Sequence, residues 1–169
     1  YRERYGGSEE DIGRIAVKAY ANANRNPNAH MRAVKMSLEV AGKAGDRNPC
    51  FLASEDLNPF IKMSDCSQVS DGASALLLVS EKGLAKLSRT QADAVEVIGR
   101  GHAVASLFDD GDLTQLTTTA LAAQKAYADS GVSAEELQIA EVHDCFTVTE
   151  LMMYEAMGLA PYGQGDALI

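Results

Sequence analysis

The chain has 169 residues, of which 46% are hydrophobic and 23% charged; 24 acidic side chains against 15 basic ones give a formal net charge of -9. This composition is that of a globular protein with enough apolar side chains for a core, which excludes intrinsic disorder. The acidic balance argues against nucleic acid or an anionic membrane surface as partner. The strongest apolar run, residues 73–79, is too short to span a bilayer.

The cysteines and histidines give no sign of a disulfide framework or a metal site. The three cysteines are an odd number without disulfide-framework spacing, so a reducing compartment is expected. The three histidines (His30, His102 and His143) lie far apart, and no Cys-x-x-Cys or His-Glu-x-x-His motif occurs. We therefore expect no metal.

Two helices are predicted near the N-terminus. Ser8 followed by three acidic residues is a typical helix start, and apolar residues at helical spacing continue to Asn26-Pro27, where the helix should end. A second helix is expected over about 28–40, closed by Gly42 and Gly45.

Residues 41–70 are expected to be irregular. The pairs Asn48-Pro49 and Asn58-Pro59 favour turns. A long irregular stretch in a folded chain is typical of a functional loop or of an excursion from a sheet.

The pattern then becomes that of an α/β protein. The apolar run 73–79 fits a strand buried on both faces, residues 80–87 fit a short helix, and residues 94–99 fit another strand. This order indicates an α/β layer. Farther along, the expected elements are a helix over 113–129 capped by Gly131, a single turn at 133–136, a strand over 137–142 and a helix over 147–157.

The segment His143-Asp144-Cys145-Phe146 lies between an expected strand and an expected helix N-terminus. Catalytic groups of open α/β sheets collect at such places. A thiol just before a helix gains from the helix dipole, which favours thiolate, and an imidazole can donate a hydrogen bond to a developing oxyanion. The alternative is a core cysteine beside a buried histidine with its hydrogen bonds satisfied, and the spacing alone leaves both open.

The following helix carries two acids. Glu155 shares a face with Val148, Leu151 and Met152, so it would need a partner there, whereas Glu150 could reach back toward the loop. Solvated helix acids are the commoner explanation for both.

The stretch from Val142 to Leu151, continuing from Tyr154 to Leu159, resembles the thiolase superfamily, and above all the sterol carrier protein-type thiolases. Their signature loop is His-Asp-Cys-Phe, where other thiolases carry Asn-Glu-Ala-Phe. The segment from Ser70 to Leu78 is similar to the Asp-Gly-Ala-rich thiolase strand, and residues 26–30 are similar to the region ahead of it. The similarity covers essentially the whole chain.

The resemblance implies an α/β fold of two similar halves, each a mixed five-stranded sheet with helices, stacked as five α-β-α-β-α layers. Only the middle portion is expected here. Residues 1–63 would be a loop domain, mostly helical and irregular, residues 64–101 the end of the N-terminal half, and residues 102–169 the start of the C-terminal half.

The resemblance also implies a reaction. A cysteine nucleophile in a Cys-x-Ser motif attacks a 3-ketoacyl-CoA, the acetyl-CoA enolate leaves, and CoA then takes the acyl group from the thioester. Acyl-CoA and CoA would be the substrates, no cofactor would be bound permanently, and a homo-oligomer, dimer or tetramer, would be expected. Relatives occur in peroxisomes, mitochondria and bacterial cytoplasm, so the compartment stays open.

Residue roles follow only from this resemblance. His143 would be the oxyanion donor and Cys145 the acid/base. Supporting roles would fall to Asp144, Phe146 and Glu150. Ser67 matches a position that touches the pantetheine arm of CoA in relatives, although its flanking residues differ.

The sequence departs from the family pattern in two places. Neither Cys50, followed by Phe51-Leu52, nor Cys66, followed by Ser67-Gln68, stands in a Cys-x-Ser motif, and no Gly-His-Pro loop occurs. We expect both motifs outside these residues, so that the chain alone is inactive and needs other segments or another copy to cover its strand edges. Two alternatives remain: a thiolase-like acyltransferase that does not degrade fatty acids, and a non-catalytic CoA- or lipid-binding module on the thiolase scaffold.

Overall fold

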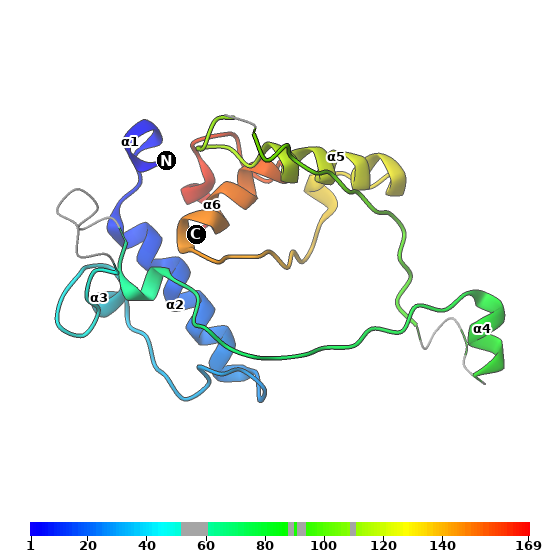
Figure 1. Cartoon of the computed structure of the whole chain (residues 1–169), viewed down its shortest axis with the longest axis horizontal. Coiled ribbons are helices and arrows are strands. Elements are labelled where there is room, and N and C mark those ends of the chain that lie inside the picture. The colour runs from blue at the N-terminus through cyan, green and yellow to red at the C-terminus, as the bar shows by residue number, and fades with distance from the viewer. Residues whose placement is uncertain (52–60, 88–89, 91–93, 109–110) are drawn as a thin grey trace.

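Helices and turns make up most of the regular structure of the computed structural model, which describes residues 1–51, 61–87, 90, 94–108 and 111–169 (Figure 1). The α-helices are α1 (Arg2–Tyr5), α2 (Glu9–Arg25), α3 (Leu38–Ala41), α4 (Glu81–Lys86), α5 (Thr117–Ser130) and α6 (Thr147–Ala156). Short 3-10 turns are η1 (Met63–Asp65), η3 (Ala134–Glu136) and η4 (Gly165–Leu168). No helix within the described ranges is both long and apolar enough to cross a membrane.

The first helix prediction is confirmed. The hydroxyl of Ser8 accepts a hydrogen bond from the Asp11 amide (3.1 Å), and the Asp11 carboxylate accepts one from the Ser8 amide (3.0 Å). This capping box satisfies amides that the first turn leaves free. The helix, α2, ends at Arg25, directly before Asn26-Pro27.

The helix predicted over 28–40 is wrong, since turns fill most of this stretch and only α3 is helical. The side-chain amide of Asn24 donates hydrogen bonds to the carbonyls of Arg32 and Val34, each at 2.8 Å. These carbonyls therefore find their donor outside a helix. The Asn28 amide is held by the Asn26 side chain at 2.9 Å, a turn that competes with a helix start.

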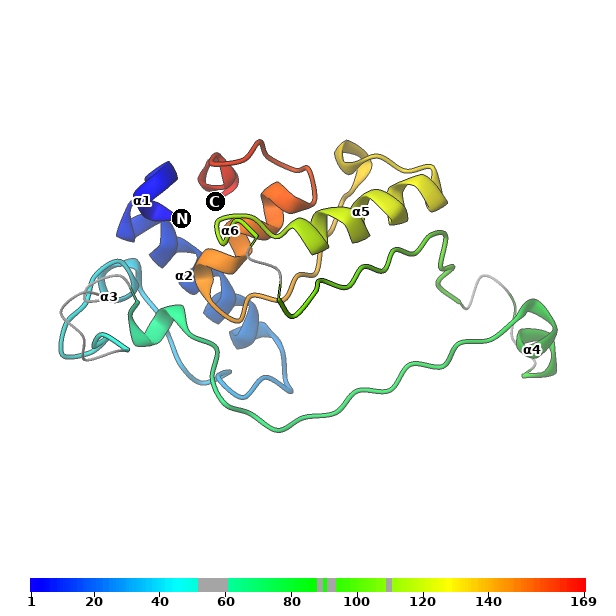
Figure 2. The same ribbon diagram turned by 45° about the horizontal axis from the view of Figure 1, so that its top comes forward.

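The hydrophobic core lies between α2 and α6, which pack side by side in both ribbon views (Figures 1 and 2). Ile12 and Ile15 of α2 contact Leu151 of α6, and all three are buried. The C-terminal end of α3 packs closely against α2. A Cβ atom at Gly13 would lie 2.8 Å from the Gly42 Cα atom, so this close approach requires glycine.

The strands expected over 73–79, 94–99 and 137–142 are not formed in the part of the chain that the structure describes. Its only ladder-type pairs are isolated bridges, Gly45 with Asn48, Cys50 with Lys62 and Cys66 with Phe146. From η1 the chain instead runs along an open path to α4 and returns toward α5 (Figure 2). A strand is held by hydrogen bonds to a neighbouring strand, and none of the described segments lies alongside these stretches as such a neighbour. Most helices of the expected α/β arrangement are present, whereas the described residues form none of its five-stranded sheets.

The helix expected over 80–87 is confirmed. It is α4, and the Ser80 hydroxyl accepts a hydrogen bond from the Gly83 amide at 3.2 Å. The turn expected at Asn58-Pro59 lies outside the described residues.

The helices expected in the C-terminal part are also confirmed. The helix α5 begins at Thr117, later than expected, because the Asp112 side chain holds the Thr114 amide at 2.9 Å in a turn. It ends at Gly131, which has a left-handed φ of 73°. The single turn at 133–136 is η3, and the last predicted helix is α6.

Candidate functional site

The His143–Phe146 loop leads directly into α6 and is fastened to the segment that follows η1. The Ser67 amide donates a hydrogen bond to the Cys145 carbonyl at 3.0 Å. Cys66 and Phe146 form an antiparallel bridge next to it. The fold thus brings Ser67 next to Cys145, two positions that the sequence singled out separately.

Cys145 is half-buried, and its Sγ atom lies 3.7 Å from the Thr149 hydroxyl, one turn into α6. Because α6 has ten residues and begins at Thr147, the thiol sits at the positive end of a helix dipole, which stabilises negative charge. His143 is exposed on the loop, and Phe146 is exposed as well. The alternative of a buried histidine with satisfied hydrogen bonds is therefore wrong.

Asp144, like Cys145, is half-buried in the loop. Burial, and after it the negative charge of Glu150, raises the pKa of the Asp144 carboxyl above its ordinary value. The positive charges of Lys18 and His143 oppose this shift.

Glu150 turns toward α2. Its carboxylate is 3% exposed and accepts hydrogen bonds from the Lys18 ammonium and the Tyr154 hydroxyl. The Lys18 Nζ atom also lies 2.7 Å from the Tyr154 hydroxyl and 5.4 Å from the ring centroid. The interpretation of Glu150 as a solvated acid is wrong, and its partner from α2 was not apparent in the sequence.

Glu155 is buried on the apolar face of α6, at 4% exposure, so the interpretation of this acid as solvated is wrong as well, and it has the partners that a buried acid requires. The Tyr1 hydroxyl donates to its carboxylate, and the Gly165 amide donates to Oε1 at 3.0 Å. Burial and the hydrogen bond to Glu155 raise the pKa of Tyr1. Glu155 therefore ties the N-terminus and η4 to α6.

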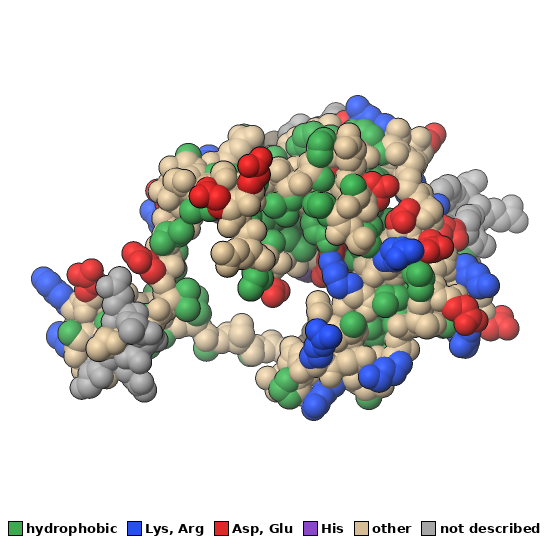
Figure 3. Space-filling view, turned by 180° about the vertical axis from the view of Figure 1, so that it is seen from behind, with side chains coloured by type: hydrophobic (Ala, Val, Ile, Leu, Met, Phe, Trp, Pro, Cys, Tyr) green, Lys and Arg blue, Asp and Glu red, His purple; other side chains and the backbone are tan. Residues whose placement is uncertain are grey.

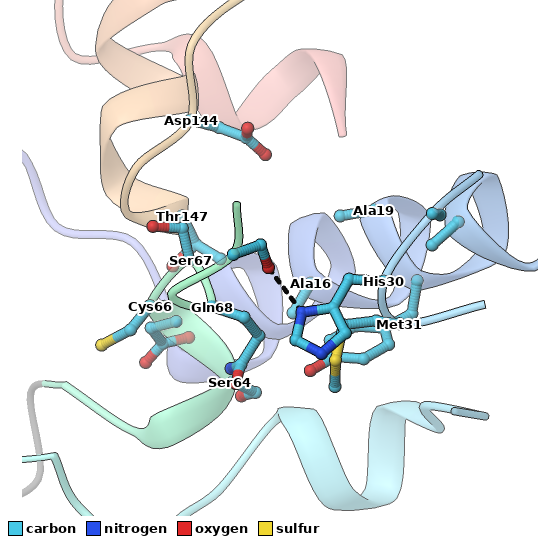
Figure 4. A pocket seen from close by; sticks show the side chains of 15 residues that line it. Ala16, Ala19, His30, Met31, Ser64, Cys66, Ser67, Gln68, Asp144 and Thr147 are labelled. Atoms are coloured by element: carbon cyan, nitrogen blue, oxygen red, sulfur yellow. Dashed lines mark hydrogen bonds between the residues drawn. The ribbon is translucent and has the colours of Figure 1, made fainter. Parts of the chain in front are cut away.

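A pocket with a volume of about 290 Å³ opens beside the loop, between α2, the turn at residues 29–31 and the segment 64–70 (Figure 4). One wall is the alanine-rich face of α2. Its polar lining includes Ser67, Gln68, Asp144 and Thr147. Ser67 and Asp144 thus share one pocket, whereas His143 and Cys145 are not part of its lining.

His30 spans the pocket from the turn, and its Nδ1 atom is hydrogen-bonded to the Ser70 hydroxyl (Figure 4). No role for His30 could be predicted, because its partner Ser70 is 40 residues away in the chain.

The segment next to the pocket is fixed by a buried ion pair. Lys62 Nζ lies 2.8 Å from Asp65 Oδ2, and both side chains are at most 4% exposed. Cys66 follows directly. Burial and the charge of Asp65 raise the pKa of its thiol. Among the described residues, no group of three or more His, Cys, Asp or Glu side chains is arranged to hold a metal ion.

Comparisons with known proteins agree with this picture. The model of the thiolase C-terminal domain-like family matches residues 99–169. Two relatives match along the whole chain: non-specific lipid-transfer protein-like 2 of Caenorhabditis elegans (31% identity) and human sterol carrier protein 2 (30%). The benzoylsuccinyl-CoA thiolase subunit BbsB of Thauera aromatica is 30% identical over 98% of the chain.

The chain is thus similar to members of the thiolase superfamily along its whole length, and residues 99–169 match the model of the C-terminal thiolase domain-like family. The resemblance found at residues 142–151 is thereby confirmed. The chain spans only part of its relatives, namely 40% of the Caenorhabditis elegans protein, 30% of the human protein and 40% of BbsB.

A solved structure has the same fold as this chain. The Ltp2-ChsH2(DUF35) aldolase superposes with a TM-score of 0.78 at 24% identity and covers 99% of this chain and 42% of its own. The superposition includes the open segments that lack strand partners. The described residues of these segments therefore follow the path of the solved fold although they form no sheet.

Proposed function

We propose that the His143–Phe146 loop is a catalytic loop of a thiolase-type acyltransferase. The reaction is CoA-dependent cleavage of a 3-ketoacyl-CoA to acetyl-CoA and a shortened acyl-CoA, or the reverse condensation. The observation that carries the proposal is the place of Cys145, at the N-terminus of α6, bonded to Thr149 and fastened to Ser67. The activity belongs to the whole protein, in which residues 1–63, 64–101 and 102–169 contribute to the loop domain, the N-terminal half and the C-terminal half.

Cys145 is proposed to act as acid and base. When the bond between the α and β carbons of the substrate breaks, the electron pair remains on the acetyl-CoA enolate, and the Cys145 thiol gives its proton to that carbon. In condensation the thiolate removes the same proton. His143, exposed beside it, donates a hydrogen bond to the enolate oxygen.

The nucleophile that carries the acyl group is proposed to be a cysteine other than Cys50 and Cys66. Neither has the Cys-x-Ser motif. Burial and the charge of Asp65 raise the pKa of Cys66, which keeps its thiol protonated and weakly nucleophilic near neutral pH.

The pocket beside Ser67 is proposed to receive part of the acyl-CoA. Its alanine-lined wall suits an apolar chain, and Ser67, Asp144 and Thr147 offer polar groups at one end. CoA is a substrate in this proposal, no permanently bound cofactor is required, and the whole protein acts as a homo-oligomer.

The test compares the reactivity of three cysteines in the whole protein. Iodoacetamide near neutral pH should alkylate Cys145 faster than Cys50 and Cys66, and acetoacetyl-CoA should protect it. Replacing Cys145 with Ala should lower thiolysis by about 10²-fold or more, as expected for an acid/base group, whereas Cys50→Ala should not. Thiolysis that survives Cys145→Ala unchanged would refute the proposal.

A second candidate is a non-catalytic module that binds CoA or lipid on the thiolase scaffold. It is supported by the names of two relatives, a lipid-transfer protein and a sterol carrier protein. Slow and equal labelling of all three cysteines, with acyl-CoA bound but not turned over, would favour this candidate.

A further inference from the structure

The contact between α2 and α6 contains a buried negative charge. The Glu150 side chain is 4% exposed, and Glu150 lies in the first turn of α6, close behind the His143–Phe146 loop. A carboxylate removed from water is strongly unfavourable unless a cation and hydrogen-bond donors compensate it. The stability of the first turn of α6 therefore depends on the groups that face Glu150.

Three ionisable groups face Glu150 from three elements. Lys18 from α2 donates to its carboxylate, Tyr154 from α6 donates to the same oxygen, and Asp144 from the loop interacts with it through charge. Only Lys18 brings a positive charge among these three. Lys18 is itself held by the Tyr154 hydroxyl at 2.7 Å, so the ammonium is fixed between both partners.

Lys18 also acts on the loop itself. Its charge opposes the effect of Glu150 on Asp144, so one ammonium moderates two carboxylates, one in the loop and one in α6. Without it, the two negative charges would repel each other across the junction of loop and helix. The Cys145–Thr149 contact spans the same junction.

We propose that Lys18 is a positioning residue that holds the His143–Phe146 loop at the start of α6 by neutralising the buried Glu150 carboxylate. The reacting groups then come from the C-terminal part of the chain, and the cation that keeps them in place comes from α2 in the N-terminal part. That Lys18 matters for the reaction rests on the proposed function of Cys145.

The first experiment measures the pH profile of Cys145 alkylation in the whole protein. If Lys18 holds the loop, Lys18→Met should let Cys145 move away from the N-terminus of α6, whose dipole favours thiolate, so alkylation near neutral pH should slow by about three- to tenfold and the pH profile should move to higher pH. Lys18→Arg keeps the charge and should stay near the wild-type profile.

A matched control is available on the same helix. Arg14 is 50% exposed, like Lys18 at 48%, and pairs with Glu10, which is on the surface of α2. Arg14→Met should leave the alkylation profile unchanged. Equal shifts in Arg14→Met and Lys18→Met would mean that only net charge matters, and would overturn the inference.

Hydrogen exchange separates this inference from the proposed function. Amides of residues 143–150 should exchange faster in Lys18→Met, and removal of the buried charge in Lys18→Met/Glu150→Gln should restore their protection. If wild-type Cys145 is unreactive, the proposed function fails, and exchange alone decides whether Lys18 holds the loop. Unchanged exchange in Lys18→Met overturns the positioning role even if Cys145 is catalytic.

Discussion

The body formed by α2, η1 and α6 differs sharply from the open arm formed by residues 71–87 and 94–98. In the body, Ile12, Ile15 and Leu151 are almost fully buried, and the charged groups among them have partners. In the arm, Leu76, Leu77 and Leu78 are 73–85% exposed. On the face seen in Figure 3, hydrophobic side chains gather beside the opening that the arm encloses.

The difference shows what each kind of element needs. A helix satisfies its backbone hydrogen bonds internally and needs only one face covered, so α2 and α6 complete each other. A buried strand needs neighbours on both edges and layers on both faces. The arm has the sequence of such strands, and its apolar side chains remain uncovered within the described residues.

The largest expected effect concerns the buried charges of the body. Lys62→Met leaves the Asp65 carboxylate buried without its cation, so unfolding free energy should fall by about 3–5 kcal/mol. Urea unfolding of the whole protein, followed by circular dichroism, measures this. The matched control is Arg47→Met, which removes an exposed pair with Glu39 and should cost less than about 1 kcal/mol. Similar costs for both variants would contradict the burial of the Lys62–Asp65 pair.

The next prediction compares the two regions directly. Leu151→Ala opens a cavity in the core and should cost about 2–5 kcal/mol in either the 169-residue chain or the whole protein. Leu77→Ala should be within about 0.5 kcal/mol of zero in the 169-residue chain, because the side chain is exposed there. A loss of stability for Leu77→Ala that appears only in the whole protein would show that the sheet partners of this stretch lie outside the 169 residues. A large loss of stability for Leu77→Ala in the 169-residue chain would contradict the exposure of this side chain and the contrast between body and arm.

The sequence predicted those features whose cause is local. The helix start at Ser8, the cap at Gly131 after α5 and the extent of α6 were predicted because each signal lies within a few residues of its effect. The need of Glu155 for a partner followed from helical periodicity alone. The helix expected over 28–40 failed because the side chain of Asn24, in the preceding helix, takes the carbonyls that a helix would need.

The site was predictable only in part, for the same reason. The loop itself was visible as a motif, but the residues that fasten it are remote. Lys18 and Glu150 are 132 residues apart, and His30 and Ser70 are 40 residues apart. No periodicity or capping rule joins such pairs, so only packing reveals them.

A smaller effect is expected from the hydroxyl beside Cys145. Thr149→Val keeps the shape of the side chain and removes the hydrogen bond to Sγ, so thiolate should be less favoured and alkylation of Cys145 near neutral pH should slow by about two- to fivefold. Thr149→Ser retains the hydroxyl and should restore the rate. The rate is read from mass spectrometry of the whole protein, with Cys66 as internal reference. Equal rates in Thr149→Val and wild type would mean that the 3.7 Å contact does not act on the thiol.

The smallest expected effect is a pH dependence of stability with opposite signs at two acids. Burial raises the pKa of Asp144, so the folded state holds this proton more tightly than the unfolded chain, and stability falls as pH rises from the ordinary value of 3.8 through the raised one. Asp144→Asn should therefore be slightly more stable than wild type at neutral pH and equal to it at low pH.

Glu136 is the control with the opposite sign. Hydrogen bonds from Ser133 lower its pKa, so Glu136→Gln should be less stable than wild type at neutral pH and should lose that difference as pH falls through the lowered pKa. Thermal unfolding over a pH series measures both. A change in stability of the same sign in both variants would show that the junction of loop and α6 is open to water, like the surface turn η3. The buried body would then not differ electrostatically from its exposed surroundings.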